Sequence, residues 1–255
     1  FWTNRNIKRK QPSDVIWAYK KFVDGLPKKD REKCLLLMHT APVDQNGTDL
    51  YAVKEKICPD YDVRFSTARI STEQLNWIHN LSDCTINIAG NEGFGLTTAE
   101  SVMAETPIIV NVTGGLQDQC GFKKDGEFLT PDDYVELGSN HERTYTEHGE
   151  WVFPVFPTNR SLQGSPATPY IWDDRCKPED AADRIKEVYD LGKEKRKELG
   201  AKAREWCLSE EAGFTAEVQG KRFIEAADEL FNTWEPREAF EVIDKKKLLI
   251  NSFNP

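Results

Sequence analysis

The chain has 255 residues, of which 38% are hydrophobic and 30% are charged, and its formal net charge is −9. This length allows one or two domains, and an α/β domain of this size buries enough surface to fold without disulfides or metals. Duplex DNA and anionic membranes attract concentrated Lys and Arg, so the acidic balance argues against nucleic acid as a ligand. No apolar run approaches the roughly 18 residues of a transmembrane helix. We therefore expect a soluble, cytoplasmic protein.

The six cysteines are scattered along the chain and form no C-x-x-C pair. This spacing indicates neither a zinc site nor a compact disulfide framework, so we expect free, largely packed thiols. Phe1 stands where an initiator Met would be, and we expect the sequence to be a piece of a longer protein.

The first 112 residues alternate between helical and strand-like patterns. Apolar residues recur every three to four positions from Val15 to Leu26, behind a Ser13-Asp14 capping signal, which predicts an amphipathic helix. The continuous apolar run 34–38 predicts a strand buried on both faces of a sheet. The same reasoning predicts helices near 50–57, 75–81 and 96–105, and strands over 63–65, 84–89 and 107–112. Such alternation is typical of a Rossmann-like, doubly wound parallel sheet with helices on both faces.

Beyond Gly115 the alternation stops. We interpret residues 120–178 as a long irregular insert, which its aromatic content and the apolar island Trp151–Phe156 indicate to be ordered. Helical spacing returns over 181–188 and 199–206, and a long C-terminal helix reaching Trp234 is interpreted as part of the core. These patterns predict one domain over 1–235, with the insert inside it, and a C-terminal tail over 236–255.

The segment "NIAGNEGFGLTTAE", residues 87–100, joins a strand to a helix through a loop that contains Gly90, Gly93 and Gly95. Glycines let the backbone approach a ligand closely, and the free N–H groups of a helix start favour anions. The pattern therefore predicts a phosphate cradle at the carboxyl end of a parallel strand. It is neither the G-x-G-x-x-G motif nor the P-loop, which weakens a nicotinamide or ATP interpretation.

Two acids, Glu92 and Glu100, flank this loop. A carboxylate beside a phosphate repels it, so these side chains suit another task, such as accepting hydrogen bonds from sugar hydroxyls. The alternative is that Glu92 is a loop charge and Glu100 part of a solvated helix face.

The run E-G-F-G-L-T-T-A-E resembles the E-x7-E motif of the retaining glycosyltransferases of family 4, which have the GT-B fold. The continuation "SVMAETPIIVNVTGGLQDQ" is similar to the helix, strand and Gly-Gly loop that follow in that family. The opening "NRNIKRKQPSDVIWAYKKF" resembles the segment that begins the family's C-terminal, donor-binding half. The order and spacing of the three blocks agree, over roughly residues 1–235.

The resemblance implies a donor site for a nucleotide-diphosphate sugar, with no metal and no other cofactor. Arg5 and Lys10 would neutralise the leaving diphosphate, although Arg9 could replace Lys10. Glu92 would bind a hydroxyl of the donor sugar and Glu100 the ribose. Backbone groups of the loop and helix start would contact phosphate and sugar, and the segment after the third strand would hold the base; these residues are Gly93, Phe94, Gly95, Leu96, Thr97, Arg69 and Ile70.

Three features depart from the family pattern. Gln11 stands where a Gly is frequent, the insert 120–178 is longer and more aromatic, and the acceptor-binding N-terminal half is not in the sequence. We therefore expect little or no transfer by this chain alone, and the acceptor is unknown. The alternatives are a sugar-nucleotide epimerase or a phosphorylase on the same fold, or a non-catalytic interaction module. Trp151, Tyr170 and Trp172 could stack on a sugar, but packing in the core or against a missing domain is the simpler interpretation.

Overall fold

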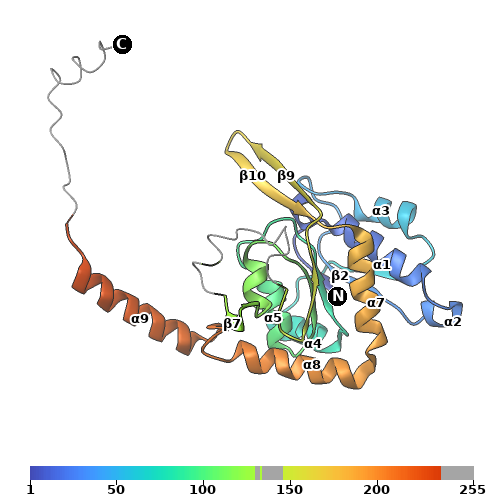
Figure 1. Ribbon diagram of the computed structural model, residues 1–255. Helices are drawn as coiled ribbons and strands as arrows, with labels where there is room; N and C mark the ends of the chain where they lie inside the picture. Colours follow the sequence, from blue (N-terminus) through green and yellow to red (C-terminus); the bar gives the residue numbers. More distant parts are fainter. Residues whose placement is uncertain (130–132, 134–145, 237–255) are drawn as a thin grey trace, which may run out of the picture. The chain divides into compact units, whose positions relative to one another are not determined.

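A computed structural model describes residues 1–129, 133 and 146–236 (Figure 1). The chain divides into two compact units, Phe1–Phe214 and Thr215–Pro255.

The first unit is built on a parallel sheet. Its strands are β1 (Trp2–Thr3), β2 (Leu36–His39), β3 (Val63–Ser66), β4 (Thr85–Asn87), β5 (Ile108–Asn111) and β8 (Val152–Val155). Strands β1, β2 and β3 pair in parallel, and so do β4, β5 and β8. The amide of Ile86 donates to the carbonyl of Phe1 at 3.0 Å and joins the two sets. The strand order across the sheet is therefore β3-β2-β1-β4-β5-β8. The chain adds β2 and β3 on one side of β1 and then β4, β5 and β8 on the other side, so the order in which strands are added reverses between β1 and β4.

The helices of this unit form two groups. They are α1 (Pro12–Asp24), α2 (Lys28–Arg31), α3 (Leu50–Ile57), α4 (Thr72–Leu81), α5 (Leu96–Met103), α7 (Pro178–Asp190) and α8 (Gly192–Cys207). Helix α1 packs against α3 and α7, whereas α5 packs against α4 and α8 (Figure 1). Parallel crossovers are right-handed, so the reversal of strand order places the two groups on opposite faces of the sheet. The predicted doubly wound arrangement is confirmed.

The core lies between the sheet and these helices. Trp2, Met38, Ile88, Ile108 and Ile109 are fully buried in it. Each such side chain contributes about 1.5–3 kcal/mol by leaving water. All six cysteines are free, as predicted.

Helix α1 shows how local sequence sets an element. Pro12 occupies the first turn, where its missing N–H costs nothing, and the helix therefore begins before the predicted Ser13-Asp14 cap. Gln11 precedes it with φ +50°, a left-handed conformation. The side chains of Val15 and Phe22 are buried, and Gly25 follows the last turn.

Two expectations about the first strands need correction. Strand β2 is not buried on both faces, because Leu36 and Met38 are buried whereas Leu37 and His39 are partly exposed. Strand β1 escaped prediction altogether, because two residues are too few to show a period. It takes its place only by pairing Trp2 with Met38 and Thr3 with His39.

The insert 120–178 is more regular than expected. The apolar island Trp151–Phe156 contains β8, which completes the parallel sheet. Strands β6 (Lys123–Lys124) and β7 (Glu127–Phe128) pair antiparallel, and β9 (Asn159–Ser165) and β10 (Thr168–Arg175) form a hairpin that projects from the unit (Figure 1). Residues 130–132 and 134–145 of the insert lie outside the described residues. Core packing is confirmed for Trp151, which is 7% exposed, and is wrong for Tyr170 and Trp172, which are 70% and 48% exposed on this hairpin. The alternative for these two, packing against a missing domain, stays a prediction.

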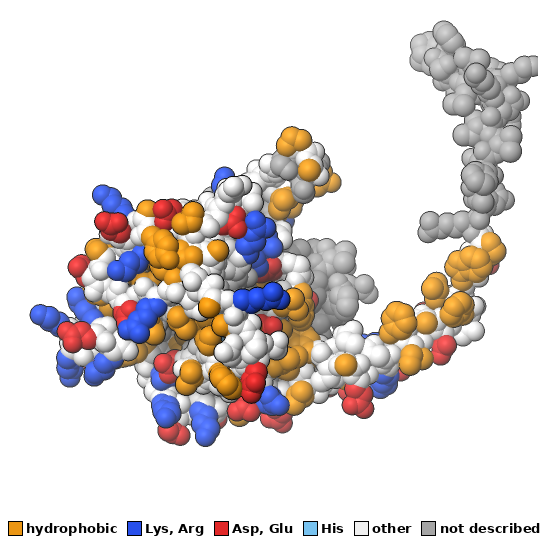
Figure 2. All heavy atoms as spheres, turned by 180° about the vertical axis from the view of Figure 1, so that it is seen from behind, with side chains coloured by type: hydrophobic (Ala, Val, Ile, Leu, Met, Phe, Trp, Pro, Cys, Tyr) orange, Lys and Arg blue, Asp and Glu red, His pale blue; other side chains and the backbone are white. Residues whose placement is uncertain are grey.

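The second unit contains helix α9 (Ala216–Thr233), whose first turn is capped by Thr215, which accepts from the amide of Val218. The predicted helix is confirmed, but the expectation that it belongs to a core is wrong: none of its side chains is buried. Figure 2 shows apolar side chains along this helix. Phe223 and Phe231 on it are 76% and 83% exposed. The predicted tail lies almost wholly outside the described residues. Within the described ranges, no helix is long and apolar enough to cross a membrane.

Candidate functional site

The site predicted from the sequence lies where the strand order reverses, at the carboxyl ends of β1 and β4. Open α/β sheets bind ligands at this position. Residues 4–11 follow β1 and residues 88–95 follow β4. The amide of Gly90 donates to the carbonyl of Arg9 at 2.8 Å and ties the two loops together. The blocks that carry the expected Arg, Lys and Glu residues are therefore neighbours in space.

The loop before α5 is held by a second glycine pair, Gly114 and Gly115, in the 3-10 helix η2 (Gly114–Gln119). The amide of Gly115 donates to the carbonyl of Glu92 at 2.9 Å. A Cβ atom at Gly115 would lie 2.0 Å from the carbonyl oxygen of Gly93, and one at Gly114 would lie 2.3 Å from that of Glu92. Only glycines allow this approach, so the Gly-Gly loop fixes the course of residues 92–94.

Helix α5 begins with the donors that a phosphate cradle needs. Gly95 precedes it at φ +86°, and its carbonyl accepts from the amides of Thr98 and Ala99. The amides of Leu96 and Thr97 then have no acceptor within the helix. No acidic residue lies in the first turn, and the helix dipole adds a partial positive charge. This helix start can bind an anion.

Gln119 holds the backbone just before α5 in place, and nothing in the sequence singled it out. Its side-chain amide donates to the carbonyls of Phe94 and Gly95, at 2.9 Å for Gly95. The ring of Phe94 meets that of Phe214 edge-on, with centroids 5.4 Å apart. The predicted role of Phe94 needs only its backbone, which these two contacts position.

Lys10 and Arg9 both pair with Glu92. The Arg9 guanidinium lies 2.9 Å from Glu92 Oε2, and the Lys10 ammonium contacts Oε1. Only 9% of the Lys10 side chain and 6% of the Glu92 side chain are exposed. Burial and the nearby Arg9 charge lower the pKa of Lys10 to about 8 despite its ion pair. The site therefore holds two cations and one carboxylate, and Lys10 loses its charge at a lower pH than an ordinary lysine, near pH 8.

Arg5 does not share this cluster. Its guanidinium pairs with Asp44 at 2.9 Å, and 64% of its side chain is exposed. That partner raises the pKa of Arg5, which stays charged. Arg5 and Lys10 were expected to act together, but in the structure Lys10 contacts Glu92 whereas Arg5 contacts Asp44. Arg9 is the second cation that contacts Glu92.

Glu100 projects from α5 with 44% of its side chain exposed, and its Oε2 lies 3.8 Å from Nε2 of the buried His79. His79 comes from α4, and nothing in the sequence paired it with Glu100. Arg69 is exposed and Ile70 partly exposed, just before Ser71, which caps α4 in a capping box with Gln74. Arg69 and Ile70 thus mark the entry to α4, and their contact with a base stays a prediction.

Within the described residues, no group of three or more His, Cys, Asp or Glu side chains is placed to hold a metal ion. The expected independence from metals and cofactors is not tested by this observation and stays a prediction.

Comparison with known sequences finds partial relatives. No protein-family model matches the sequence. The chain is 32% identical to the trehalose synthase of Thermococcus litoralis over 123 residues, which cover 47% of this chain and 29% of that protein. It is 33% identical to the trehalose synthase of Pyrococcus horikoshii over 125 residues, or 47% and 28%. The match thus spans less than a third of these curated relatives.

Solved structures resemble a larger part of the chain. A structure of Anabaena Alr3699/HepE in complex with UDP matches with a TM-score of 0.59 at 14% identity, over 90% of this chain and 48% of that one. The Escherichia coli structure described as trehalose-6-phosphate bound with UDP-2-fluoro glucose gives 0.58 at 11% identity, over 93% and 44%. WaaG, a glycosyltransferase involved in lipopolysaccharide biosynthesis, gives 0.52 at 14% identity, over 88% and 46%. At such identities the similarity establishes the fold, which is one half of a GT-B fold, as predicted.

Proposed function

We propose that this chain is the donor-binding half of a retaining glycosyltransferase that uses a nucleotide-diphosphate sugar. The observation that carries the proposal is the meeting of Lys10, Arg9 and Glu92 beside the open start of α5, at the carboxyl edge of a parallel sheet. The sequence similarity to trehalose synthases and the fold shared with UDP-bound structures support it.

The proposed chemistry follows from the charges. Cleavage of the sugar–phosphate bond builds negative charge on the leaving diphosphate, and fixed cations stabilise that charge more in the transition state than in the ground state. Lys10 and Arg9, with the amides of Leu96 and Thr97, supply positive charge and donors at one place. A metal ion is then unnecessary for this step. Arg5 would join them only by leaving Asp44, so its predicted role is the least supported of the three cations.

Glu92 and Glu100 have the acceptor chemistry that sugars need. Once a diphosphate attracts Lys10 and Arg9, the carboxylate of Glu92 is released to accept from a hydroxyl of the donor sugar. Glu100 is exposed at the first turns of α5, where it can accept from the ribose. Gly93, Phe94 and Gly95 offer backbone groups between them, and Arg69 and Ile70 would meet the base.

The acceptor belongs to the other half of the proposed enzyme. The chain corresponds to 44–48% of the solved structures cited above. We propose that an N-terminal half, in the same or an associated chain, binds the acceptor, that the transferred group is a hexose, and that its anomeric configuration is retained.

Calorimetric titration with UDP and with GDP tests the donor site. We expect saturable binding of at least one of them, weakened about tenfold or more by Glu100→Ala, because a carboxylate that accepts from a hydroxyl contributes about 1.5–3 kcal/mol. Glu205→Ala is the matched control, since Glu205 is also an exposed helical glutamate but lies on α8. No binding of either nucleotide, or equal binding by the Glu100 and Glu205 variants, would contradict the proposal.

A further inference from the structure

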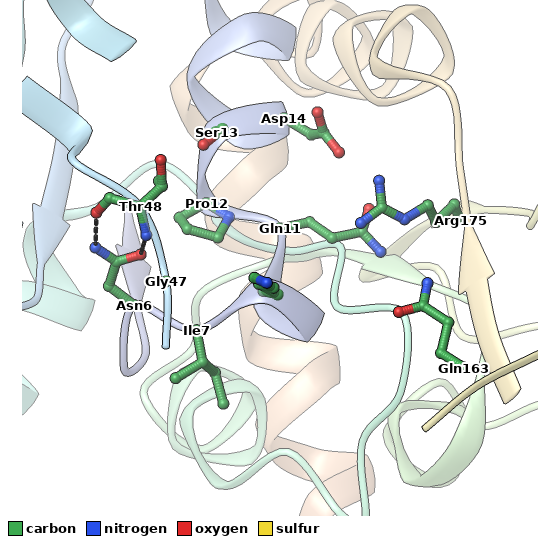
Figure 3. A pocket seen from close by; sticks show the side chains of 11 residues that line it. Asn6, Ile7, Gln11, Pro12, Ser13, Asp14, Gly47, Thr48, Gln163 and Arg175 are labelled. Atoms are coloured by element: carbon green, nitrogen blue, oxygen red, sulfur yellow. Dashed lines mark hydrogen bonds between the residues drawn. The ribbon is translucent and has the colours of Figure 1, made fainter. Parts of the chain in front are cut away.

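A polar cavity of about 220 Å³ lies beside the first turn of α1, and Lys10 is not among the residues that line it. Its walls come from three parts of the chain: residues 6–14, the loop at Gly47 and Thr48, and the β9–β10 hairpin through Gln163 and Arg175 (Figure 3). This volume has room for several waters or for one small polar molecule.

The walls of the cavity are firmly built. Asn6 is fully buried, and its side-chain amide donates to the carbonyls of Ala41, Pro42 and Thr48, at 2.7 Å for Thr48. A Cβ atom at Gly47 would lie 2.1 Å from the carbonyl oxygen of Asn6. The glycine is therefore required, and the wall formed by Gly47 and Thr48 is held in place without a ligand.

Gln11 is the unusual member of the lining. Only 3% of the residue is exposed, yet neither its Oε1 nor its Nε2 has a hydrogen-bond partner among the described residues. Figure 3 shows its side chain pointing toward Arg175 and Gln163. Buried amides are nearly always paired, and the terminal torsion of a glutamine turns easily. A molecule in the cavity can therefore supply the partners that the protein does not.

The charges around the cavity balance. Lys8 and Arg175 bring two cations, while Asp14 and Asp173 bring two carboxylates. Arg175 already pairs with Asp173 at 3.1 Å. The carboxylate of Asp14 would repel a phosphate, whereas donors and acceptors set side by side match hydroxyl groups, which both donate and accept. Ile7 and Pro12 add an apolar surface of the kind that C–H groups of a sugar ring contact.

We propose that this cavity binds a neutral sugar, with Gln11, Asp14 and Arg175 hydrogen-bonded to its hydroxyl groups. None of the residues Glu92 to Gly95 lines the cavity, so the cavity is separate from the loop before α5 that we propose binds the donor. The two are nevertheless adjacent, because the amide of Asp174 in the hairpin donates to the carbonyl of Gly90 at 2.9 Å. If the sugar is part of the acceptor, that assignment rests on the proposed function, but its binding here does not.

Two-dimensional ¹H–¹⁵N NMR of the full chain tests the proposal, with D-glucose as the probe and no nucleotide present. The side-chain amide signal of Gln11 is identified by its loss in Gln11→Gly, which suits the left-handed backbone at this position. We expect glucose to shift this signal saturably, and Asp14→Asn to weaken the response about tenfold. Asp60→Asn, at an exposed aspartate outside the cavity, is the matched control and should leave it unchanged. Gln163→Ala changes the opposite, hairpin wall and should also weaken the response.

The proposal is overturned if glucose leaves the Gln11 signal in place, or shifts it equally in the wild type, Asp14→Asn and Gln163→Ala. A shift produced by inorganic phosphate or glycine, and not by glucose, would also overturn it. So would a glucose response that Glu92→Gln abolishes and Asp14→Asn leaves intact, because the sugar would then lie at the donor loop. UDP binding is measured separately, so either proposal can fail while the other stands.

Discussion

Replacing Glu92 by Gln keeps the shape of the side chain and removes the carboxylate that Lys10 and Arg9 contact. Lys10 is then left as a buried cation beside Arg9. Removing one partner of a buried ion pair costs about 3–5 kcal/mol. We expect a smaller loss, about 1–1.5 kcal/mol at pH 7, because Lys10 can release its proton: with a pKa of about 8, its neutralisation costs only about 1.4 kcal/mol, and this cost limits the loss.

The sign of the pH dependence follows from the same shift. The pKa of Lys10 is lowered by folding, so between about 8 and the ordinary lysine value of 10.5 the unfolded chain binds more protons than the folded one. The contribution of Lys10 to the free energy of unfolding therefore rises with pH between these two values. At pH 9 Lys10 is mostly neutral, the ion pair has largely gone, and the difference between the wild type and Glu92→Gln should shrink.

Urea unfolding followed by circular dichroism measures the free energy of unfolding of the wild type and of Glu92→Gln, at pH 7 and again at pH 9. Glu179→Gln is the control, because Glu179 pairs with Lys21 on the surface and its loss should change little. The double variant Lys10→Met/Glu92→Gln should be more stable than Glu92→Gln alone, since it has no stranded lysine. A loss below about 0.5 kcal/mol at pH 7, or the same loss at pH 9, would refute the description of a buried, coupled pair.

Two further outcomes are expected at the same site. UDP affinity should fall as the pH rises through about 8, where Lys10 loses its charge, and Lys10→Arg should flatten this dependence because arginine stays protonated; a calorimetric pH series that shows parallel curves would count against Lys10 as a phosphate ligand. Gly115→Ala should displace the loop at Gly93 and destabilise the protein by about 1–3 kcal/mol, measured by urea unfolding. Gly220→Ala, where a Cβ meets nothing within 4 Å, is its control, and equal effects of the two variants would disprove the close approach.

The periodic parts of the fold could be predicted from the sequence. Helix α1 buries a stripe of apolar residues, among them Val15, Tyr19 and Phe22, and that stripe is visible as a spacing of three to four. Helices α3, α4 and α5 also form where the spacing predicted them, although their only buried apolar side chains are Leu50, Ala99 and Val102. Strands β2 and β5 are short, largely apolar runs bounded by polar loops. Strand β8 has the same signature at Trp151–Phe156, but the unusual composition around it concealed its place in the sheet.

The loop of residues 90–95, with its three glycines, could be predicted for a similar reason. Its conformational needs are written into residue types, because Gly95 at φ +86° and Gly115 against Gly93 tolerate no other side chain without strain. Glu92 and Glu100 were found through this loop, which made two ordinary glutamates notable.

The partners of these residues depend on tertiary structure. Arg5, Arg9 and Lys10 are equally basic in the sequence, and only the folded loop sends Arg5 to Asp44 and the other two to Glu92. The unpaired amide of Gln11 likewise becomes visible only when the hairpin closes one wall of the cavity.

The amino-acid sequence by itself therefore determined the doubly wound class and the position of the glycine loop, because periodicity and glycine are local properties. Burial and charge pairing are not local. The apolar stripe of α9 predicted a core helix, yet no side chain of that helix is buried. Residue spacing shows that one face of a helix is apolar, but it does not show which part of the protein covers that face. In the same way, the charge of Lys10 was evident from its residue type, but its lowered pKa was decided by the burial and the neighbouring arginine that the folded chain supplies.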